Sequence, residues 1–459
     1  PPILSTSERK SKFVNVLFVV LLYCTHLSAQ VTLPNNLYFT HIGVEDGLCQ
    51  NTVCCILQDH LGFIWLGTKD GLTRYDGYRF RVFKHDAADP MSIGNNFIRV
   101  LYEDADGLIW IGTNVGVYIY NPETENFRKF DVATERGDVI SREVSSIKCD
   151  SSGDLWIGVN WQGVFRYDRR DESLELYEPV PGDTTSLSSV HVWDLCFDGD
   201  GNLWVGSQNG GLDRYDRETD RFVRHRLKGL SDVSRIVLDK QNQLLLGTMK
   251  DGLFSFNPYM GTCQPLLLDS GHKDLFVRAI FVRNSREVVV GTENGIYIYD
   301  CVTRKTRHVN QELGNPYSLS CKAVYSIYCD KEGALWIGTY FGGVNYLPPS
   351  SSLIFDKFYP IGHSDRLSGK AVREFVRDES GIIWIGTEDQ GLNRFDPVSG
   401  KFTHYNSRNS GLSCDNVHGL CVDGDRLYIG TFFGGFNIMD LKTNEIVALG
   451  SQMLPDDSV

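Results

Sequence analysis

The strongest constraint on the fold is a motif that recurs through most of the chain. It reads roughly V-x-x-I-x-x-D-x-x-G-x-(L/I)-W-I-G-T-x-x-G-(L/V)-x-R-Y-D. The clearest copies carry Trp65, Trp110, Trp156, Trp204, Trp336 and Trp384, and three weaker copies carry Leu245, Val289 and Tyr428 at the same place. The motif repeats about every 45 residues, which is the length of a four-stranded propeller blade.

Each copy contains four short strand signals and no helical periodicity, as in residues 98–103, 108–113, 117–120 and 127–130. The Asp-x-x-Gly between the first two strands, such as Asp104 to Gly107, favours a tight hairpin. Asp can bond to the turn backbone, and Gly accepts a positive φ. We expect the large, flat tryptophan to lie between neighbouring blades. The sequence therefore predicts an all-β protein built of four-stranded propeller blades.

The copies predict one complete ring and the start of another. Residues 30–349 are predicted to form a seven-bladed β-propeller, which ends at Pro348, Pro349 and a run of serines typical of a linker. Residues 350–459 hold two copies and are predicted to be the first blades of a second, truncated β-propeller. Residues 39–42 resemble a fourth strand, so we expect them to close blade seven and remove exposed sheet edges. In blade six, Arg283 and Arg286 replace the turn Asp and Gly, which predicts an altered hairpin.

Residues 1–29 have the order of a secretory signal peptide. Arg9, Lys10 and Lys12 precede a mostly apolar run over 13–24, and small residues follow as far as Ala29. The apolar run is shorter than the roughly 20 residues of a membrane-spanning helix. Cleavage after Ala29 is therefore favoured over a retained anchor, and the mature chain is expected to be exported.

Charge and cysteine usage argue against several classes of function. The chain holds 45 Lys and Arg against 58 Asp and Glu, and the net charge of −13 disfavours a surface for nucleic acid or anionic lipid. The 12 cysteines include no CxxC pair, which favours buried thiols over a disulfide framework or a zinc site. The turn at Asp104 resembles the start of a calcium loop but lacks the Glu at the twelfth position. No metal and no cofactor are predicted.

Together these segments resemble the two-component regulator propeller repeat. The resemblance runs from about Phe39 to the end and includes the opening Glu45-Asp46-Gly47-Leu48 and the segments 62–68 and 74–78. It implies two seven-bladed propellers in the periplasm, then an immunoglobulin-like connector, one membrane helix, a cytoplasmic histidine kinase, a receiver and a DNA-binding domain. Such proteins sense glycan breakdown products. The resemblance thus implies an oligosaccharide ligand, signalling to a kinase outside these residues, attachment to the inner membrane only through a downstream helix, and a homodimer formed through the full receptor.

Candidate ligand residues are those that break the chemistry of the repeat. The residue after the first-strand Val or Ile varies strongly; it is Cys54, Arg99, Ser145, Trp193, Ser234, Arg278, Tyr325, Arg373 and His418 in chain order. Arginine and aromatic side chains there can bond to hydroxyls or carboxylates and stack on sugars. The candidates from this column are Arg99, Trp193, Arg278, Tyr325, Arg373 and His418. The alternative is that they are framework contacts between blades.

The loop between the second and third strands supplies the other candidates. It is usually polar but becomes aromatic at Trp161, at Tyr340-Phe341 and at Phe432-Phe433. Of these, Trp161, Tyr340 and Phe341 are the candidates for stacking on sugars. Packing against the second propeller or a dimer partner is the alternative.

Catalysis is not predicted for these residues. Most carboxylates occupy repeated turns, and no unrepeated acid pair or nucleophile-base arrangement is present. His191 and His418 break the repeat, but a lone histidine in a channel is more typical of hydrogen bonding than of a base. No catalytic residue is therefore assigned, and the segment is predicted not to be an enzyme. The alternatives are a glycosidase or lyase on a propeller scaffold, and a propeller that binds only proteins.

Overall fold

The computed structural model describes residues 32–225, 227, 230, 232–266, 275–349, 357–359 and 366–449. The predicted signal peptide lies outside these residues, as does most of the predicted linker. The described chain is all-β, with thirty-six strands and one short 3-10 helix, η1 (Val44–Asp46), which confirms the predicted fold class. No helix within the described ranges is long and apolar enough to cross a membrane.

The chain divides into two compact units. The first unit comprises the described residues of 32–311 and 317–349, and the second comprises 312–316 together with the described residues from 357 onward. Nine four-stranded antiparallel sheets are formed in all, each from strands that follow one another, with one exception. That exception is the sheet that joins β1 to β26–β28.

The first unit holds seven of the nine sheets. Their strands are β2–β5 (Val53–Gln58, Ile64–Thr68, Gly71–Tyr75, Phe80–Phe83), β6–β9 (Ile98–Glu103, Ile109–Thr113, Gly116–Asn121, Asn126–Lys129), β10–β13 (Val144–Cys149, Leu155–Val159, Gly163–Asp168, Ser173–Tyr177), β14–β17 (Val192–Phe197, Leu203–Ser207, Gly211–Asp216, Arg221–His225), β18–β21 (Val233–Leu238, Leu244–Thr248, Leu253–Asn257, Thr262–Leu266), β22–β25 (Val277–Val282, Glu287–Thr292, Gly295–Asp300, Thr306–Val309), and β26–β28 (Val324–Cys329, Leu335–Thr339, Val344–Leu347) with β1 (Thr40–Ile42).

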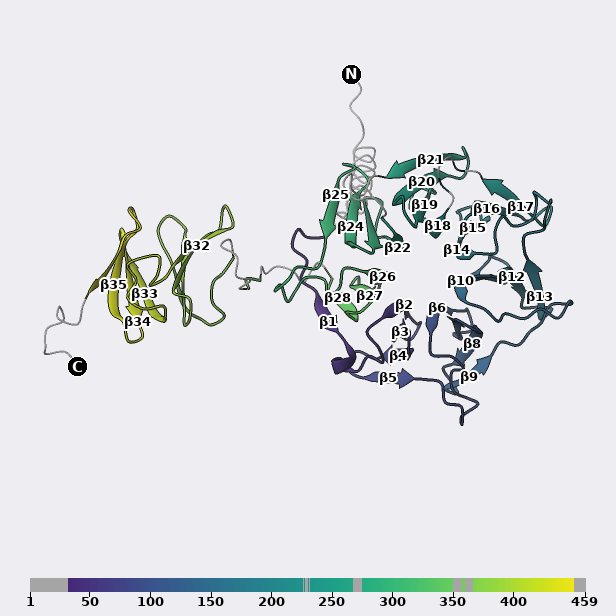
Figure 1. Cartoon of the computed structure of the whole chain (residues 1–459), viewed down its shortest axis with the longest axis horizontal. Coiled ribbons are helices and arrows are strands. Elements are labelled where there is room, and N and C mark those ends of the chain that lie inside the picture. The colour runs from purple at the N-terminus through teal and green to yellow at the C-terminus, as the bar shows by residue number, and fades with distance from the viewer. Residues whose placement is uncertain are drawn as a thin grey trace, which may run out of the picture. The chain divides into compact units, whose positions relative to one another are not determined.

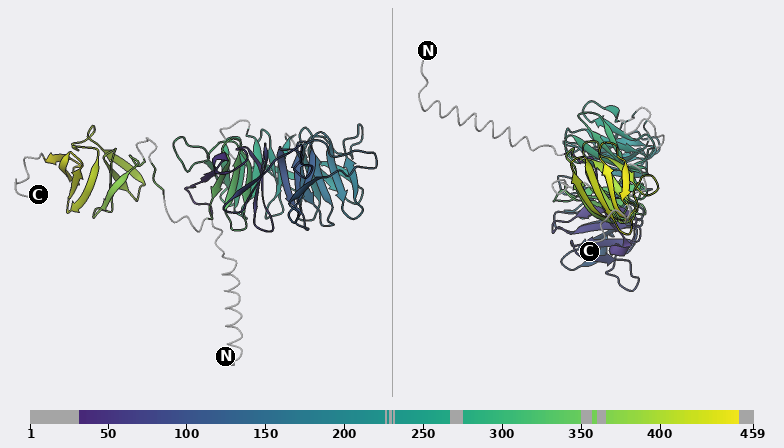
Figure 2. Two further views of the ribbon diagram at one scale, coloured as in Figure 1. Left: turned by 90° about the horizontal axis from the view of Figure 1, so that it is seen from below. Right: turned by 90° about the vertical axis from the view of Figure 1, so that its left-hand side faces the viewer.

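These seven sheets stand around a common axis (Figure 1). The first strand of each sheet is innermost and contacts the first strand of the next, from β2 through β22, and β26 returns to contact β2. The ring closes in the last sheet, where β1 pairs with β28 in the register Thr40↔Tyr346 and Ile42↔Val344. This is the pairing expected for the N-terminal strand. Seen from the side, the connecting loops of this unit gather on two opposite faces (Figure 2).

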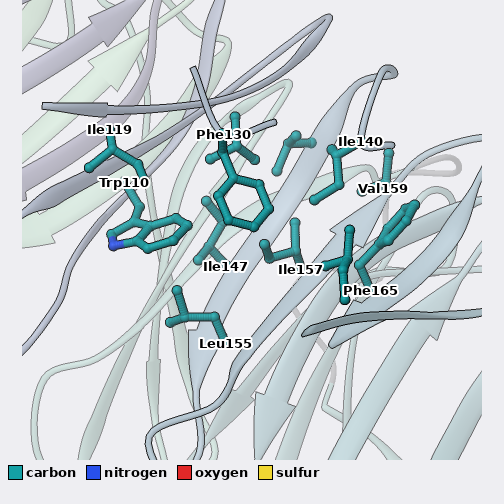
Figure 3. Close-up of a cluster of buried hydrophobic side chains, with 12 residues drawn as sticks. Trp110, Ile119, Phe130, Ile140, Ile147, Leu155, Ile157, Val159 and Phe165 are labelled. Atoms are coloured by element: carbon teal, nitrogen blue, oxygen red, sulfur yellow. The ribbon is translucent and has the colours of Figure 1, made fainter. Parts of the chain in front are cut away.

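The motif tryptophans lie between neighbouring sheets, as predicted. Trp110 of β7 packs with Ile147 of β10 and Leu155 of β11 in the next sheet (Figure 3). Trp336 of β27 packs on Val53 and Leu66 of the first sheet and so continues the core across the closure. At about 25 cal/mol per Å² of buried apolar surface, such plates contribute several kcal/mol each to the association of the sheets.

The motif glycine is required by the same packing. A Cβ on Gly112 would lie 2.6 Å from Cγ1 of Val144, and one on Gly247 would lie 2.6 Å from Cγ1 of Val277. In both cases the valine opens the first strand of the following sheet. The strand that carries the Trp therefore needs a residue without a side chain where the next sheet approaches.

Blade six has the altered hairpin that the sequence predicts. Asn284 takes over the role of the turn Asp, since its Oδ1 accepts the backbone N–H groups of Arg286 and Glu287 at 2.8 Å each. Glu287 is buried, pairs with Arg283 at 2.9 Å, and accepts the backbone N–H of Leu33. Through its bond to Leu33, the Glu287 carboxylate joins the segment before β1 to the sixth sheet.

The second unit contains two sheets. They are β29–β32 (Val372–Arg377, Ile383–Thr387, Leu392–Asp396, Lys401–Tyr405) and β33–β36 (Val417–Asp423, Arg426–Thr431, Gly435–Asp440, Ile446–Leu449). Trp384 packs between them with Val417 and Leu427, in the manner of the first unit. All eleven cysteines of the described residues are free thiols.

Candidate ligand site at the mouth of the ring

The variable column found in the sequence consists of β-bulge residues. In the first sheet Val53 pairs with Thr68 and Cys55 pairs with Gly67, so Cys54 is the extra residue of the first strand. The same shift occurs in all nine sheets, and the extra residues are Cys54, Arg99, Ser145, Trp193, Ser234, Arg278, Tyr325, Arg373 and His418. A bulge bends the strand and re-aims one side chain. The repeat thus provides one re-aimed side chain per blade on the innermost strand.

Six of these bulge residues line one cavity, the channel cavity, in the middle of the first unit. Its lining consists of Cys54, Arg99, Glu143, Val144, Ser145, Trp193, Arg235, Arg278 and Tyr325. The space open to water is about 50 Å³, enough for roughly four water molecules. The cavity therefore accepts a small group and not a whole sugar ring.

Five of the nine bulge residues also contact the start of the loop fourteen or fifteen positions later. Nε of Arg99 donates to Asn114 at 2.9 Å, Arg278 pairs with Glu293, and the rings of Tyr325 and Tyr340 lie 5.1 Å apart. In the second unit Arg373 pairs with Glu388 at 3.1 Å, and His418 stacks on Phe432 at 4.9 Å between ring centroids. The two groups of candidates that the sequence presents as separate columns are therefore neighbours in space.

Cations lie against aromatic rings at and beside the channel cavity. The guanidinium of Arg278 lies over Phe276 at 4.1 Å and over Tyr325 at 4.3 Å, measured to the ring centroids. The ammonium of Lys69 lies 4.2 Å from the ring of Tyr340. Each cation–π contact of this kind stabilises the position of the charged group by up to about 2 kcal/mol where water is excluded.

The three arginines of the channel cavity differ in their partners. Arg99 pairs with Glu143, and Arg278 pairs with Glu293. Arg235 donates instead to two backbone carbonyls, that of Arg278 at 2.6 Å and that of Ser234 at 3.2 Å. Among the residues the structure describes, no carboxylate pairs with Arg235.

Trp193 is the lining residue of the channel cavity with an unsatisfied N–H. Its indole Nε1 is buried and has no acceptor among the described residues. A buried N–H without an acceptor costs about 1–3 kcal/mol. Trp193 therefore carries an unsatisfied N–H next to the channel cavity, and Arg235 adds N–H groups that its two backbone carbonyls do not use.

Not every predicted residue reaches the channel cavity. Trp161 is 66% exposed and its ring lies against His191, with 4.1 Å between centroids. Phe341 is 67% exposed and packs on Tyr340 at 4.0 Å, so it borders the mouth without lining it. Arg373 and His418 belong to the second unit.

The structure also adds residues that the sequence analysis missed. Glu143 precedes the first strand by one residue, and Arg235 follows a bulge by one residue, so neither falls in the variable column. Ser234, which does fall in the column, is 2% exposed and donates to the carbonyl of Val277 at 2.8 Å. The signal that could have found Arg235 is its charge, since it is the one cation at the position after the bulge in the nine first strands.

A second, larger cavity of about 370 Å³ lies beside β13 and has the opposite charge. Its lining includes Glu135, Asp138, Glu175, Glu178 and Asp220, with one cation, Arg136. Within the described residues no group of three or more His, Cys, Asp or Glu side chains has the geometry of a metal site.

Comparison with known proteins identifies the repeat. Residues 47–70, 92–115, 186–209 and 318–341 match the family described as two component regulator propeller. These four segments of the chain are therefore similar to two-component regulator propeller repeats. Each matched segment ends just after the second strand of a blade and so includes the bulge and the loop residue that it contacts.

Two of the solved structures that are similar to this chain are extracellular domains of putative hybrid two-component systems. One, from a putative hybrid two-component system of B. thetaiotaomicron, is 27% identical with a TM-score of 0.73, and the match covers 90% of this chain and 55% of that chain. A second from the same organism is 21% identical with a TM-score of 0.59, covering 92% and 54%. "Histidine kinase P4" of Formosa agariphila is 39% identical over 59 residues, which are 13% of this chain and 4% of that protein.

The propeller-repeat chain is thus homologous to extracellular domains of hybrid two-component systems and spans about half the length of the first of them. Virginiamycin B lyase from Staphylococcus aureus shares the fold alone, with 12% identity and a TM-score of 0.52 over 68% of this chain and 99% of that chain. The repeated turn carboxylates, such as Asp104 and Asp150, are occupied by their own hairpins and tryptophans.

Proposed function

We propose that the chain is the ligand-sensing part of a periplasmic hybrid two-component sensor and that its ligand is an oligosaccharide released from a glycan. The observation that carries the proposal is the convergence of six bulge residues on one cavity, bordered by exposed aromatic rings. Framework residues would repeat from blade to blade, whereas these vary between arginine, tryptophan, tyrosine and serine.

The rim of the ring offers surfaces that suit sugars. Phe341 and Tyr340 form a contiguous aromatic pair next to Tyr325, and Lys69 adds a hydrogen-bond donor beside it. Exposed rings of this kind stack on the apolar faces of sugars. Trp161 adds a second ring, and it holds φ at 70°, an uncommon backbone state for a bulky residue that often marks a functional loop.

The rest of the sensor lies outside these residues in this proposal. The histidine kinase that receives the signal and the helix that anchors it in the inner membrane follow downstream. Homodimerisation takes place through the full receptor. This segment itself contacts no nucleic acid, in keeping with its net charge of −13.

Calorimetry of the chain against a panel of neutral and acidic oligosaccharides tests the proposal, with chromatography of the same samples for products. We expect binding without turnover, weakened at least tenfold by Phe341→Ala. Tyr78→Ala is the matched control, because Tyr78 is 93% exposed in the turn between β4 and β5. Product formation would support an enzyme instead, and silence across the panel would support a propeller that binds only proteins.

A further inference from the structure

We infer that the channel cavity binds one oxyanionic group, a carboxylate or a sulfate, and that this group is a substituent of an acidic sugar whose ring rests on the rim. The inference builds on the proposed function and narrows its ligand class. It depends on the donors, the size and the charge of the channel cavity.

The donors of the cavity exceed its acceptors. Glu143 is the one carboxylate in the lining, and it is already paired with Arg99. Arg235 uses two of its five N–H donors on backbone carbonyls, and Nε1 of Trp193 has no acceptor within the described chain. An oxyanion accepts several hydrogen bonds at once and would use the N–H groups that Arg235 has left.

The arginine geometry also suits an oxyanion. Two carbonyl bonds and the neighbouring backbone hold the Arg235 side chain in place, so little side-chain freedom remains to be lost on binding. The fixed fork of a guanidinium matches the two oxygens of a carboxylate or sulfate. Arg278, held between Phe276 and Tyr325, lies beside it.

The positive field of the site is felt at Cys54, another member of the lining. Burial raises the pKa of its thiol to about 11, and Arg99, Lys69, Arg278 and Arg235 each act in the opposite direction. Four cations thus act on one point of a chain whose net charge is −13, although Arg99 and Arg278 are each paired with a glutamate. The attraction for an anion is therefore local to the channel cavity.

The size of the cavity decides how much of the ligand enters. About 50 Å³ holds a group of three to five heavy atoms, but not a pyranose ring. Phe341, Tyr340 and Lys69 border the same mouth and offer the ring a place outside. A sugar that carries a carboxylate or sulfate fills both places at once.

The test is calorimetry of the full chain at constant ionic strength with sodium glucuronate, a glucuronate-containing oligosaccharide, sodium sulfate, and a neutral glucose oligosaccharide of the same length. Arg235→Gln is the main variant, and Trp193→Phe removes the N–H donor while keeping an aromatic ring. Arg221→Gln is the matched control, because Arg221 is exposed on β17 and donates to Thr185 Oγ1 at 2.6 Å. Thermal unfolding of each variant checks that it remains folded.

We expect the acidic oligosaccharide to bind at least tenfold more tightly than the neutral one. Arg235→Gln should remove this preference for the acidic oligosaccharide, and Trp193→Phe should reduce it. Arg221→Gln should leave the preference unchanged. If sulfate binds in an Arg235-dependent way and sugars do not, the site takes free inorganic anions, and the proposed function fails while the oxyanion site stands. If a neutral oligosaccharide binds as tightly as the acidic one and is indifferent to Arg235→Gln, the inference is overturned while the proposed function stands. Absence of any Arg235-dependent anion binding also overturns it.

Discussion

Nε1 of Trp110 donates to Oδ2 of Asp104 at 2.8 Å, and Oδ1 of the same carboxylate accepts the backbone N–H of Leu108 at 3.0 Å. One buried carboxylate therefore holds both the hairpin turn and the aromatic plate that packs against the next sheet. The pairing recurs wherever the motif has its tryptophan, at Asp59, Asp104, Asp150, Asp198, Asp330 and Asp378. The turn and the contact between sheets are thus coupled.

Asp104→Ala is expected to destabilise the protein by about 3 kcal/mol, because it leaves a buried indole N–H and a turn N–H without acceptors. Denaturant unfolding measures the change. Asp131→Ala is the control, since Asp131 is exposed and pairs only with Lys129 at the surface. An equal loss of unfolding free energy in Asp104→Ala and Asp131→Ala would show that the hydrogen bonds of Asp104 to Trp110 and Leu108 contribute nothing to stability.

Asp213→Asn is expected to stabilise the protein at neutral pH. Asp213 is fully buried, its Oδ2 accepts two bonds from Ser188, and its Oδ1 has no partner among the described residues. Asn345 holds the equivalent place in another sheet and donates to Ser320 Oγ at 2.9 Å, so the chain itself shows that an amide fits.

The gain from Asp213→Asn should depend on pH. Burial raises the pKa of Asp213 from 3.8 to about 6, which lowers the stability of the folded state by about 3 kcal/mol at neutral pH. Since the folded state holds this proton more tightly than the unfolded state, stability is greatest below about pH 4 and falls as the pH rises to about 6. Unfolding measured from pH 4 to 8 should show the difference between variant and parent growing from pH 4 to about pH 6 and staying constant above it. A difference that is constant over the whole range would contradict the assignment.

Cys54 is expected to resist alkylation although it lines the channel cavity. Burial raises the pKa of its thiol to about 11, so at pH 8 roughly one molecule in a thousand carries the thiolate. Pulse labelling with iodoacetamide, read by mass spectrometry, should modify the exposed Cys421 first and Cys54 only at higher pH or after unfolding. Comparable rates for the two cysteines at pH 8 would be the contrary result.

Phe39→Ala is expected to cost about 4 kcal/mol. Phe39 is 1% exposed, packs with Leu319, Leu335 and Leu347, and its N–H donates to the carbonyl of Tyr317 at 2.9 Å. Its loss should loosen β1 from β28, which hydrogen exchange at residues 344–347 would detect. Leu61→Ala, in an exposed turn, should leave both stability and exchange unchanged.

The repeat made the strands, the tryptophan packing and the pairing of β1 predictable, because each follows from a pattern that recurs along the chain. The set of residues that line the channel cavity was harder to predict from the sequence. The bulge that re-aims Arg99 and Trp193 leaves no mark in the alternation of apolar residues, so its contact with the loop fifteen residues later was missed. Glu143 and Arg235 enter the cavity from positions next to the column, and only the three-dimensional register brings them there.

The pairing of β1 with β28 also bears on how the first unit folds. Thr40 meets Tyr346, so the last sheet joins segments about three hundred residues apart, and loop closure on that scale costs entropy before any contact is gained. The other six sheets of the first unit each form from consecutive strands, so each can pair as soon as its own four strands have been synthesised. During synthesis the N-terminal strand must stay unpaired until β28 has emerged, so sealing of the ring is expected to be the last and slowest step of folding, and the channel cavity acquires its full set of walls only then.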